Sequence, residues 1–155
     1  MQIGVIGAGQ CSSSVEKTAE EVGREIAKHK AVLICGGLGG VMEAAARGAQ
    51  LEGGLTIGIL PGTSKESANP YIDVSIITDI GHARNVLVVR SSDAIIALGG
   101  SYGTLSEIAI GIKLKIPIIG LNTWEISKEI IQAKTAKEAV SIATSFLSHF
   151  PINSS

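Results

Sequence analysis

Short apolar runs alternate along this chain with longer segments in which apolar residues recur at helical spacing. The apolar runs are continuous, as in strands that are covered on both faces of a sheet. Alternation of such strands with helices predicts an α/β fold: a Rossmann-like, doubly wound parallel sheet of about six to seven strands, with helices on both faces. The predicted strands are residues 2–7, 32–35, 56–60, 74–78, 94–98 and 117–121.

Two of the predicted helices begin with a capping-box signature, in which Ser or Thr is followed three residues later by Glu. Ser13-x-x-Glu16 opens the first helix and Thr135-x-x-Glu138 opens the last. Apolar residues follow each signature at helical spacing. They are Val15, Ala19, Val22, Ile26 and Ala27 in the first helix, and Ala139, Ile142, Ala143, Phe146 and Leu147 in the last.

The segment around Val86–Val89 is a strand on propensity alone, but connectivity favours a helix. If residues 74–78 and 94–98 form parallel strands, the chain between them must cross over the sheet, usually through a helix. We therefore predict a helix over His82–Arg90. The polar segment Pro61–Tyr71 is predicted to be a loop over the carboxyl ends of the strands, the edge where open α/β sheets bind ligands.

Length and hydropathy bound the organisation of the chain. Its 155 residues predict a single nucleotide- or phosphate-binding domain over residues 1–150, followed by a tail over residues 151–155. No apolar run of roughly 18 residues is free of charge, which argues against a membrane partner. The first residues lack the basic flank of a signal peptide and indicate a buried strand, so we expect a cytoplasmic protein.

Charge and cysteine content argue against several classes of function. The net charge of −1 and the aromatic content of 3% do not suit a nucleic-acid surface, which needs clustered basic residues and stacking rings. Cys11 and Cys35 have neither CxxC spacing nor a nearby pair of histidines. The sequence therefore predicts no disulfide framework and no metal site.

Two glycine-rich segments, each between an apolar strand and a helix, carry the strongest functional signal. Glycine lets the backbone approach a bound group, and the free N–H groups at the start of a helix attract anions. Two such loops in one domain predict a phosphorylated ligand held between them, although a glycine-rich turn can also be only a tight connection. The candidate binding residues are Gly36, Gly37, Gly39 and Gly40 in the first loop, and Gly99, Gly100, Ser101, Gly103 and Thr104 in the second.

Several polar residues near these loops have both a structural and a functional interpretation. Thr104 either caps a helix, with Glu107 completing a capping box, or turns its hydroxyl toward a phosphate. Arg84 is either a solvated surface residue or, at the carboxyl edge of the sheet, a partner of phosphate or of Glu107. His82 alone is weak support for acid or base chemistry.

The first turn, Gly7-Ala-Gly-Gln-Cys-Ser12, imitates the start of a dinucleotide fingerprint. The match is weak because Ser12 replaces the third glycine and no acidic residue stands near Cys35 at the end of the second strand. NAD binding in the usual mode is therefore disfavoured. Gly9 and Ser12 remain candidates for contact with phosphate, and Ser12 also for helix capping. No Gly-x-Ser-x-Gly elbow supports a serine hydrolase.

Three motifs together resemble the superfamily formerly labelled "possible lysine decarboxylases". They are Gly36-Gly-Leu-Gly-Gly-Val-Met-Glu43, His82-Ala-Arg-Asn85 and Gly99-Gly-Ser-Tyr-Gly-Thr-Leu-Ser-Glu107. The superfamily includes the Lonely-guy (LOG) cytokinin-activating phosphoribohydrolases and the molybdenum-cofactor carrier proteins. The resemblance spans about residues 1–145, and no lysine suited to pyridoxal phosphate (PLP) is apparent.

The enzyme branch shows an Arg-Lys pair and, fifteen residues after the Arg, Pro-Gly-Gly-x-Gly-Thr-x-x-Glu. Arg84 and Glu107 match this pattern in register, so the resemblance implies that they would be the catalytic pair of an enzyme. Asn85, Gly99 and Ser101 depart from it and make the chain more similar to the carrier branch. The resemblance thus implies a binder of a phosphorylated nucleotide-like molecule, such as a nucleotide monophosphate or a molybdopterin cofactor.

The alternative that the resemblance leaves open is a phosphoribohydrolase that releases a free base from a nucleoside 5'-monophosphate. In either case the family implies a homo-oligomer, a dimer or a tetramer, with the helix that begins near Thr104 close to an interface.

Overall fold

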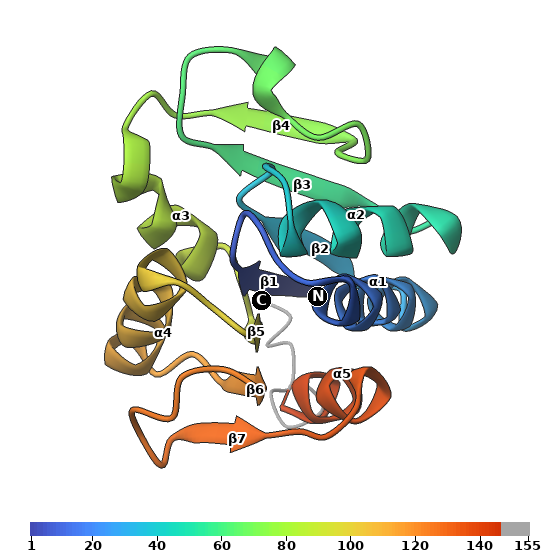
Figure 1. The fold of residues 1–155 in the computed structure, drawn as a ribbon, viewed down its shortest axis with the longest axis vertical. Coiled ribbons are helices and arrows are strands. Elements are labelled where there is room, and N and C mark those ends of the chain that lie inside the picture. Colours follow the sequence, from blue (N-terminus) through green and yellow to red (C-terminus); the bar gives the residue numbers. More distant parts are fainter. Residues whose placement is uncertain (147–155) are drawn as a thin grey trace, which may run out of the picture.

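The computed structural model describes residues 1–146 and shows a seven-stranded sheet with five α-helices (Figure 1). The strands are β1 (Gln2–Gly7), β2 (Val32–Cys35), β3 (Thr56–Leu60), β4 (Val74–Ile77), β5 (Ala94–Leu98), β6 (Ile118–Leu121) and β7 (Ile130–Gln132). The helices are α1 (Ser13–Lys28), α2 (Val41–Leu51), α3 (Asn85–Arg90), α4 (Tyr102–Leu114) and α5 (Ala136–Ser145), with short 3₁₀ turns η1 (Lys65–Ser67) and η2 (Gly81–Arg84).

The sheet has the order β4-β3-β2-β1-β5-β6-β7, and every pairing in it is parallel. The chain first builds outward from β1 to β4 and then returns to place β5 on the other side of β1. The direction of winding therefore changes between β1 and β5. A crevice at the carboxyl ends of the strands is expected at this switch point.

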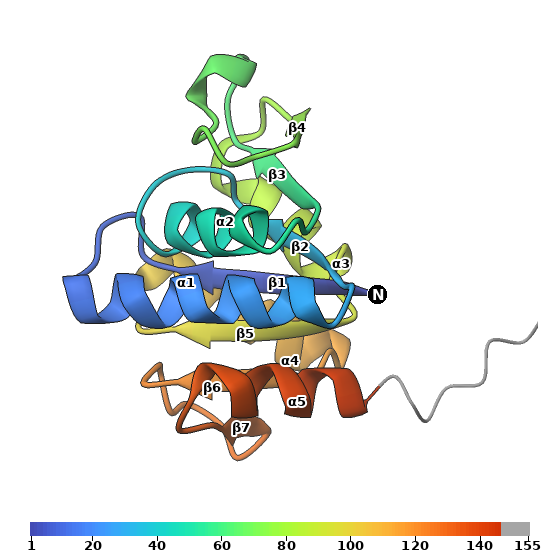
Figure 2. The same cartoon turned by 90° about the vertical axis from the view of Figure 1, so that its right-hand side faces the viewer.

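Helices cover both faces of the sheet. Helices α1, α2 and α5 lie side by side on one face, and α3 and α4 lie on the other (Figures 1 and 2). Each face has its own apolar core, the larger under α1, α2 and α5 and the smaller under α3 and α4. The predicted Rossmann-like, doubly wound α/β fold is confirmed.

The last strand and the first helix cap differ from the predictions. β7 has only three residues, too few for an apolar run to stand out, and pairs with β6 from the edge of the sheet. The cap of α1 is Ser12, whose hydroxyl accepts a hydrogen bond from Val15 N, so the proposed Ser13 box begins one residue too late. The Thr135 cap of α5 is confirmed, since its hydroxyl accepts from Glu138 N at 3.1 Å.

The segment predicted as a helix from His82 to Arg90 is helical, as the 3₁₀ turn η2 followed directly by α3. Val88 and Val89 are buried against the sheet, while Val86 and Leu87 are exposed. Crossover connectivity therefore overrides β propensity here.

Within residues 1–146, none of the helices is long and apolar enough to cross a membrane. Leu147 and the predicted tail over residues 151–155 lie outside the described residues.

Candidate functional site

A cavity of about 180 Å³ opens at the carboxyl edge of the sheet, at the switch point. It lies between the end of β1, the loop after β2, the start of α3 and the first turns of α4. Its polar side chains come from two of the three motifs that carry the family resemblance, residues 82–85 and 99–107. The lining residues are Val5, Ile6, Gly7, Gly9, Gly36, Leu38, Met42, His82, Arg84, Asn85, Ser101, Gly103, Thr104 and Glu107.

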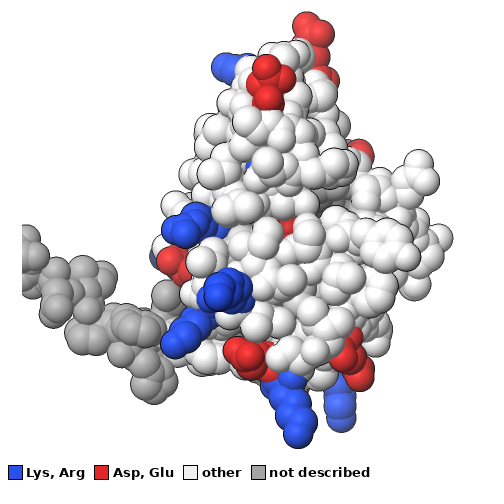
Figure 3. All heavy atoms as spheres, turned by 90° about the vertical axis from the view of Figure 1, so that its left-hand side faces the viewer, with Lys and Arg blue, Asp and Glu red and all other residues white. Residues whose placement is uncertain are grey.

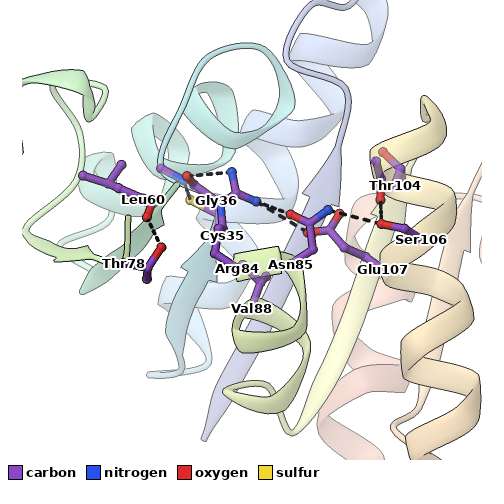
Figure 4. Close-up of polar contacts among 12 residues, drawn as sticks. Cys35, Gly36, Leu60, Thr78, Arg84, Asn85, Val88, Thr104, Ser106 and Glu107 are labelled. Atoms are coloured by element: carbon purple, nitrogen blue, oxygen red, sulfur yellow. Dashed lines mark hydrogen bonds and ion pairs between the residues drawn. The ribbon is translucent and has the colours of Figure 1, made fainter. Parts of the chain in front are cut away.

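Arg84 lines this cavity and is only 8% exposed. Its Nη1 donates to Asn85 Oδ1 at 2.6 Å, and its Nη2 donates to the carbonyl oxygen of Gly36 at 3.2 Å (Figure 4). A Cβ atom at position 36 would lie 2.5 Å from Nη2, so a glycine there lets the guanidinium rest against the backbone. The structure thus places Arg84 inside the site rather than in solvent.

Arg84 and Glu107 face each other across the cavity, with Nη1 and Oε1 4.0 Å apart. Both side chains are buried, and burial raises the pKa of Glu107 to about 7 even though Arg84 opposes the shift. Burial also lowers the pKa of Arg84. Among the described residues, Arg84 Nε has no hydrogen-bond partner. The guanidinium therefore retains donor capacity for an anion, which an arginine binds through charge-assisted hydrogen bonds.

The helix cap at the second glycine-rich loop differs from the capping box considered from sequence. Ser101 is the N-cap of α4, and Thr104 Oγ1 accepts from Ser101 N at 3.4 Å. Thr104 thus occupies the third helical position and is 1% exposed. Glu107, one helical turn further, does not close a box with Thr104. Its carboxylate faces Arg84 instead.

A series of side-chain hydrogen bonds joins α3 to α4. Asn85 accepts from Arg84 through Oδ1 and donates through Nδ2 to Ser106 Oγ at 3.2 Å, while Ser106 Oγ donates to Gly103 O at 2.7 Å (Figure 4). Both oxygen and nitrogen of the Asn85 amide are therefore used. The predicted ligand residue Asn85 orients the guanidinium of Arg84 in this structure.

The connection between β6 and β7 holds the second loop from outside. Thr123 Oγ1 donates to Gly99 O, and Trp124 Nε1 donates to Ser101 O at 3.2 Å. Gly99 and Gly100 have φ angles of +54° and +140°, a region that favours glycine. These bonds fix the loop at the N-terminus of α4, whose first N–H groups lack intrahelical acceptors.

The first glycine-rich loop is fixed from the opposite side by Asn69, which is 8% exposed. Asn69 Nδ2 donates to Leu38 O at 2.8 Å and to Gly37 O at 3.3 Å. The loop over Pro61–Tyr71 thus contacts the first glycine-rich loop and holds its backbone. Asn69 was not predicted from the sequence, because nothing in the local sequence shows that one amide of a polar loop will be buried.

The structure gathers eight of the predicted site residues around the cavity and leaves six outside its lining. The eight are Gly9, Gly36, Arg84, Asn85, Ser101, Gly103, Thr104 and Glu107. The six are Ser12, which caps α1, and Gly37, Gly39, Gly40, Gly99 and Gly100, which shape the two loops. Sequence analysis gave His82 little weight and did not propose five further lining residues, which lie in β1, in the first glycine-rich loop and in α2: Val5, Ile6, Gly7, Leu38 and Met42.

Metal and thiol chemistry have little support in the part of the chain that the structure describes. No three His, Cys, Asp or Glu residues there lie close enough to hold a metal ion. Cys35 is fully buried, and burial raises the pKa of its thiol to about 11. Burial also raises the pKa of the Cys11 thiol.

Parallel strands wound outward from a switch point, with glycine-rich turns and a buried arginine at their carboxyl ends, define a Rossmann-like α/β protein. The chain belongs to the SLOG cluster4 family, whose model matches residues 1–148. This confirms the resemblance to the LOG superfamily.

Solved structures similar to this chain include molybdenum-cofactor proteins. The molybdenum cofactor binding protein of Rippkaea orientalis superposes with a TM-score of 0.90 at 35% identity, over 94% of this chain and 96% of that one. The molybdenum cofactor carrier protein of Chlamydomonas reinhardtii gives a TM-score of 0.87 at 32% identity, over 95% and 98%. The likeness to the carrier branch therefore extends over nearly the whole fold.

The enzyme branch is represented by the probable cytokinin riboside 5'-monophosphate phosphoribohydrolase LOGL9 of Oryza sativa. It is 35% identical over 61% of this chain and 43% of that enzyme. The chain thus spans less than half of that relative's length.

Proposed function

We propose that this protein binds a phosphorylated, nucleotide-like small molecule, of which a molybdopterin-type cofactor is the leading candidate. The observation that carries the proposal is Arg84, buried in a cavity at the switch point with its Nε unpartnered among the described residues. A buried cation with spare donors favours an anionic ligand. The likeness to the two molybdenum-cofactor proteins supports a molybdopterin-type ligand in particular.

In this proposal Arg84 pairs with the phosphate, and the first turn of α4 supplies backbone donors from the opposite wall. Gly103 and Thr104 line the cavity at that turn. A phosphate at a helix N-terminus gains both from free N–H groups and from the helix dipole. Asn85 keeps the guanidinium oriented, a role that binding needs whether or not the ligand is transformed.

The alternative function is a nucleoside 5'-monophosphate phosphoribohydrolase, and Glu107 favours it. A carboxyl group whose pKa is about 7 holds and releases protons near neutral pH, as a general acid or base requires. Placed beside Arg84, Glu107 would orient a ribose hydroxyl or assist departure of the base through an oxocarbenium-like transition state. Asn85, Gly99 and Ser101, which depart from the enzyme pattern, favour binding without hydrolysis.

Incubation with a panel of nucleoside 5'-monophosphates separates the two functions. Calorimetry measures binding, and chromatography measures free base, with Glu107→Gln as the matched variant. Binding without base release supports the carrier function and directs the search to cofactors that co-purify with the protein. Base release by the native protein but not by Glu107→Gln supports the phosphoribohydrolase. Failure of every nucleotide and of a molybdopterin-type cofactor to bind contradicts both.

The proposal includes a homo-oligomer, a dimer or a tetramer, and one face of the molecule supports it. Ile76, Ile77 and Ile80 at β4 and Val86 and Leu87 on α3 are exposed apolar side chains. Figure 3 shows an area without charged side chains on the face that α3 and α4 cover, bordered along one side by Lys and Arg side chains. Light scattering of the native protein and of Leu87→Glu tests this, since a charge on the buried interface should dissociate the assembly.

A further inference from the structure

We propose that Tyr102, backed by Trp124, forms an aromatic wall on which the planar heterocycle of the phosphorylated ligand stacks. The inference rests on the proposed function and adds the part of the site that recognises a purine or pterin ring. Neither residue belongs to the cavity lining or to the residues predicted from sequence.

Tyr102 is the first residue of α4 and is 83% exposed, and its two neighbours in the chain, Ser101 and Gly103, line the cavity. Its ring stacks on that of Trp124, with centroids 6.2 Å apart and planes inclined by 26°. Because 83% of Tyr102 is exposed, the stack on Trp124 leaves much of this residue open to solvent. The sequence has only two tyrosines, two phenylalanines and one tryptophan, so two of its five aromatic rings meet here.

Trp124 also fixes the position of this wall. Its indole N–H donates to Ser101 O, so the ring is held against the glycine-rich loop rather than free in solvent. Gly100 allows this approach, because a Cβ atom there would lie 3.1 Å from Trp124 Nε1. An aromatic platform held in place before binding loses less conformational freedom when a ring stacks on it.

The small volume of the cavity explains why a ring outside it would contact the ligand. A volume of about 180 Å³ is below the roughly 300–1,000 Å³ of sites that enclose a drug-sized ligand. A nucleotide or pterin phosphate whose anionic end reaches Arg84 must therefore extend past the rim. Tyr102 is an exposed ring between two residues that line the cavity, and every nucleobase or pterin has a π-face that can stack on it.

Calorimetric titration of AMP, GMP and ribose 5-phosphate isolates the contribution of the heterocycle. The native protein should bind the nucleotides more tightly than ribose 5-phosphate. Tyr102→Ala should weaken nucleotide binding at least about fivefold, the lower end of a lost base–aromatic stack, and leave ribose 5-phosphate unchanged. Tyr102→Phe keeps the ring and should bind as the native protein does. The exposure of Tyr102 means that neither substitution disturbs the core.

Trp124 is the only tryptophan of the sequence, so its fluorescence reports on the wall directly. Nucleotides should change this fluorescence and ribose 5-phosphate should not. The same response to both compounds contradicts stacking.

Three results overturn the inference. If Tyr102→Ala leaves nucleotide affinity unchanged and ribose 5-phosphate still binds, stacking on Tyr102 is contradicted but the proposed function is not. Unchanged affinity together with a changed assembly state assigns Tyr102 to an interface between copies instead. If the nucleotides, ribose 5-phosphate and a molybdopterin-type cofactor all fail to bind, the proposed function and the inference that rests on it both fail.

Discussion

The two glycine-rich loops look equivalent in sequence and differ in the structure. In the first, glycines permit close packing of protein on protein: Gly37 lies against Leu60, and Gly40 against the carbonyl of Ala8. In the second, Gly103 lines the cavity, and the only atom within 4 Å of a Cβ there would be Ser101 Oγ, 3.9 Å away. The first loop therefore shapes the site from behind, and the second presents open backbone to a ligand.

The comparison also explains the position of Arg84. The first loop contributes Gly36 and Leu38 to the cavity, and the carbonyl of Gly36 accepts from Arg84. The second brings Glu107 to the other side of the guanidinium. The first loop holds the guanidinium of Arg84, and the second leads into α4, whose N-terminal turns carry the carboxylate of Glu107 that faces it. Substitutions in the two loops should therefore have different consequences.

The largest effect is expected from Gly40→Ala in the first loop. The position has a φ of +62°, and the new Cβ would lie 2.3 Å from Ala8 O, so strain and clash add. We expect a loss of roughly 2–4 kcal/mol in the free energy of unfolding, measured by chemical denaturation.

Gly53→Ala is the matched control for Gly40→Ala. Gly53 has a φ of +71° with nothing within 4 Å of the new Cβ, so it carries the conformational cost alone, about 1 kcal/mol. Equal losses in the two variants would show that close packing does not distinguish the first loop.

Next in size is the effect of Arg84→Ala on ligand binding. Removal of a charge-assisted contact should weaken binding of a nucleoside monophosphate by roughly 1.5–3 kcal/mol, measured by calorimetry. His82→Ala, which removes another lining residue, should have a smaller effect. Arg84→Lys keeps the charge but loses the planar fork, and should recover part of the affinity. Equal losses of affinity from Arg84→Ala and His82→Ala would contradict the assignment of Arg84 as the main phosphate-binding residue.

Glu107 predicts a pH dependence of stability. Its pKa rises on folding from 4.5 to about 7, so between these values the folded protein holds a proton that the unfolded chain has released. The contribution of Glu107 to the free energy of unfolding should therefore be greatest below about pH 4.5 and fall as pH rises to about 7, by an amount on the order of 1–3 kcal/mol. Denaturation at several pH values measures the slope, and Glu107→Gln should flatten it. An unchanged slope in that variant would assign the dependence to another group.

The smallest change in stability is expected from Gly103→Ala in the second loop. The added Cβ meets no close contact, and alanine is favoured over glycine within a helix, so stability should rise by roughly 0.5–1 kcal/mol. Ligand affinity should fall, because the methyl group enters the space where a phosphate approaches the helix. A variant that is more stable and binds as well as the native protein would move the ligand away from the second loop.

Local signals in the sequence were sufficient for most of the fold. Continuous apolar strands, helical spacing and the Thr135 cap each depend on residues within one or two turns, so they can be read without tertiary knowledge. The three-residue strand β7 was missed because its pairing with β6 is a long-range contact with no pattern of its own.

The sequence by itself determined the doubly wound sheet, the two glycine-rich turns, and Arg84 and Glu107 as candidates. Only the tertiary structure decided that Glu107 faces Arg84 instead of closing a capping box, that Asn69 fixes the first loop, and that Tyr102 and Trp124 stack on each other. The physical reason is the range of the interactions. Propensity, capping and periodicity act between near neighbours in the chain, whereas burial, pKa and ring stacking depend on residues that only the folded sheet brings together.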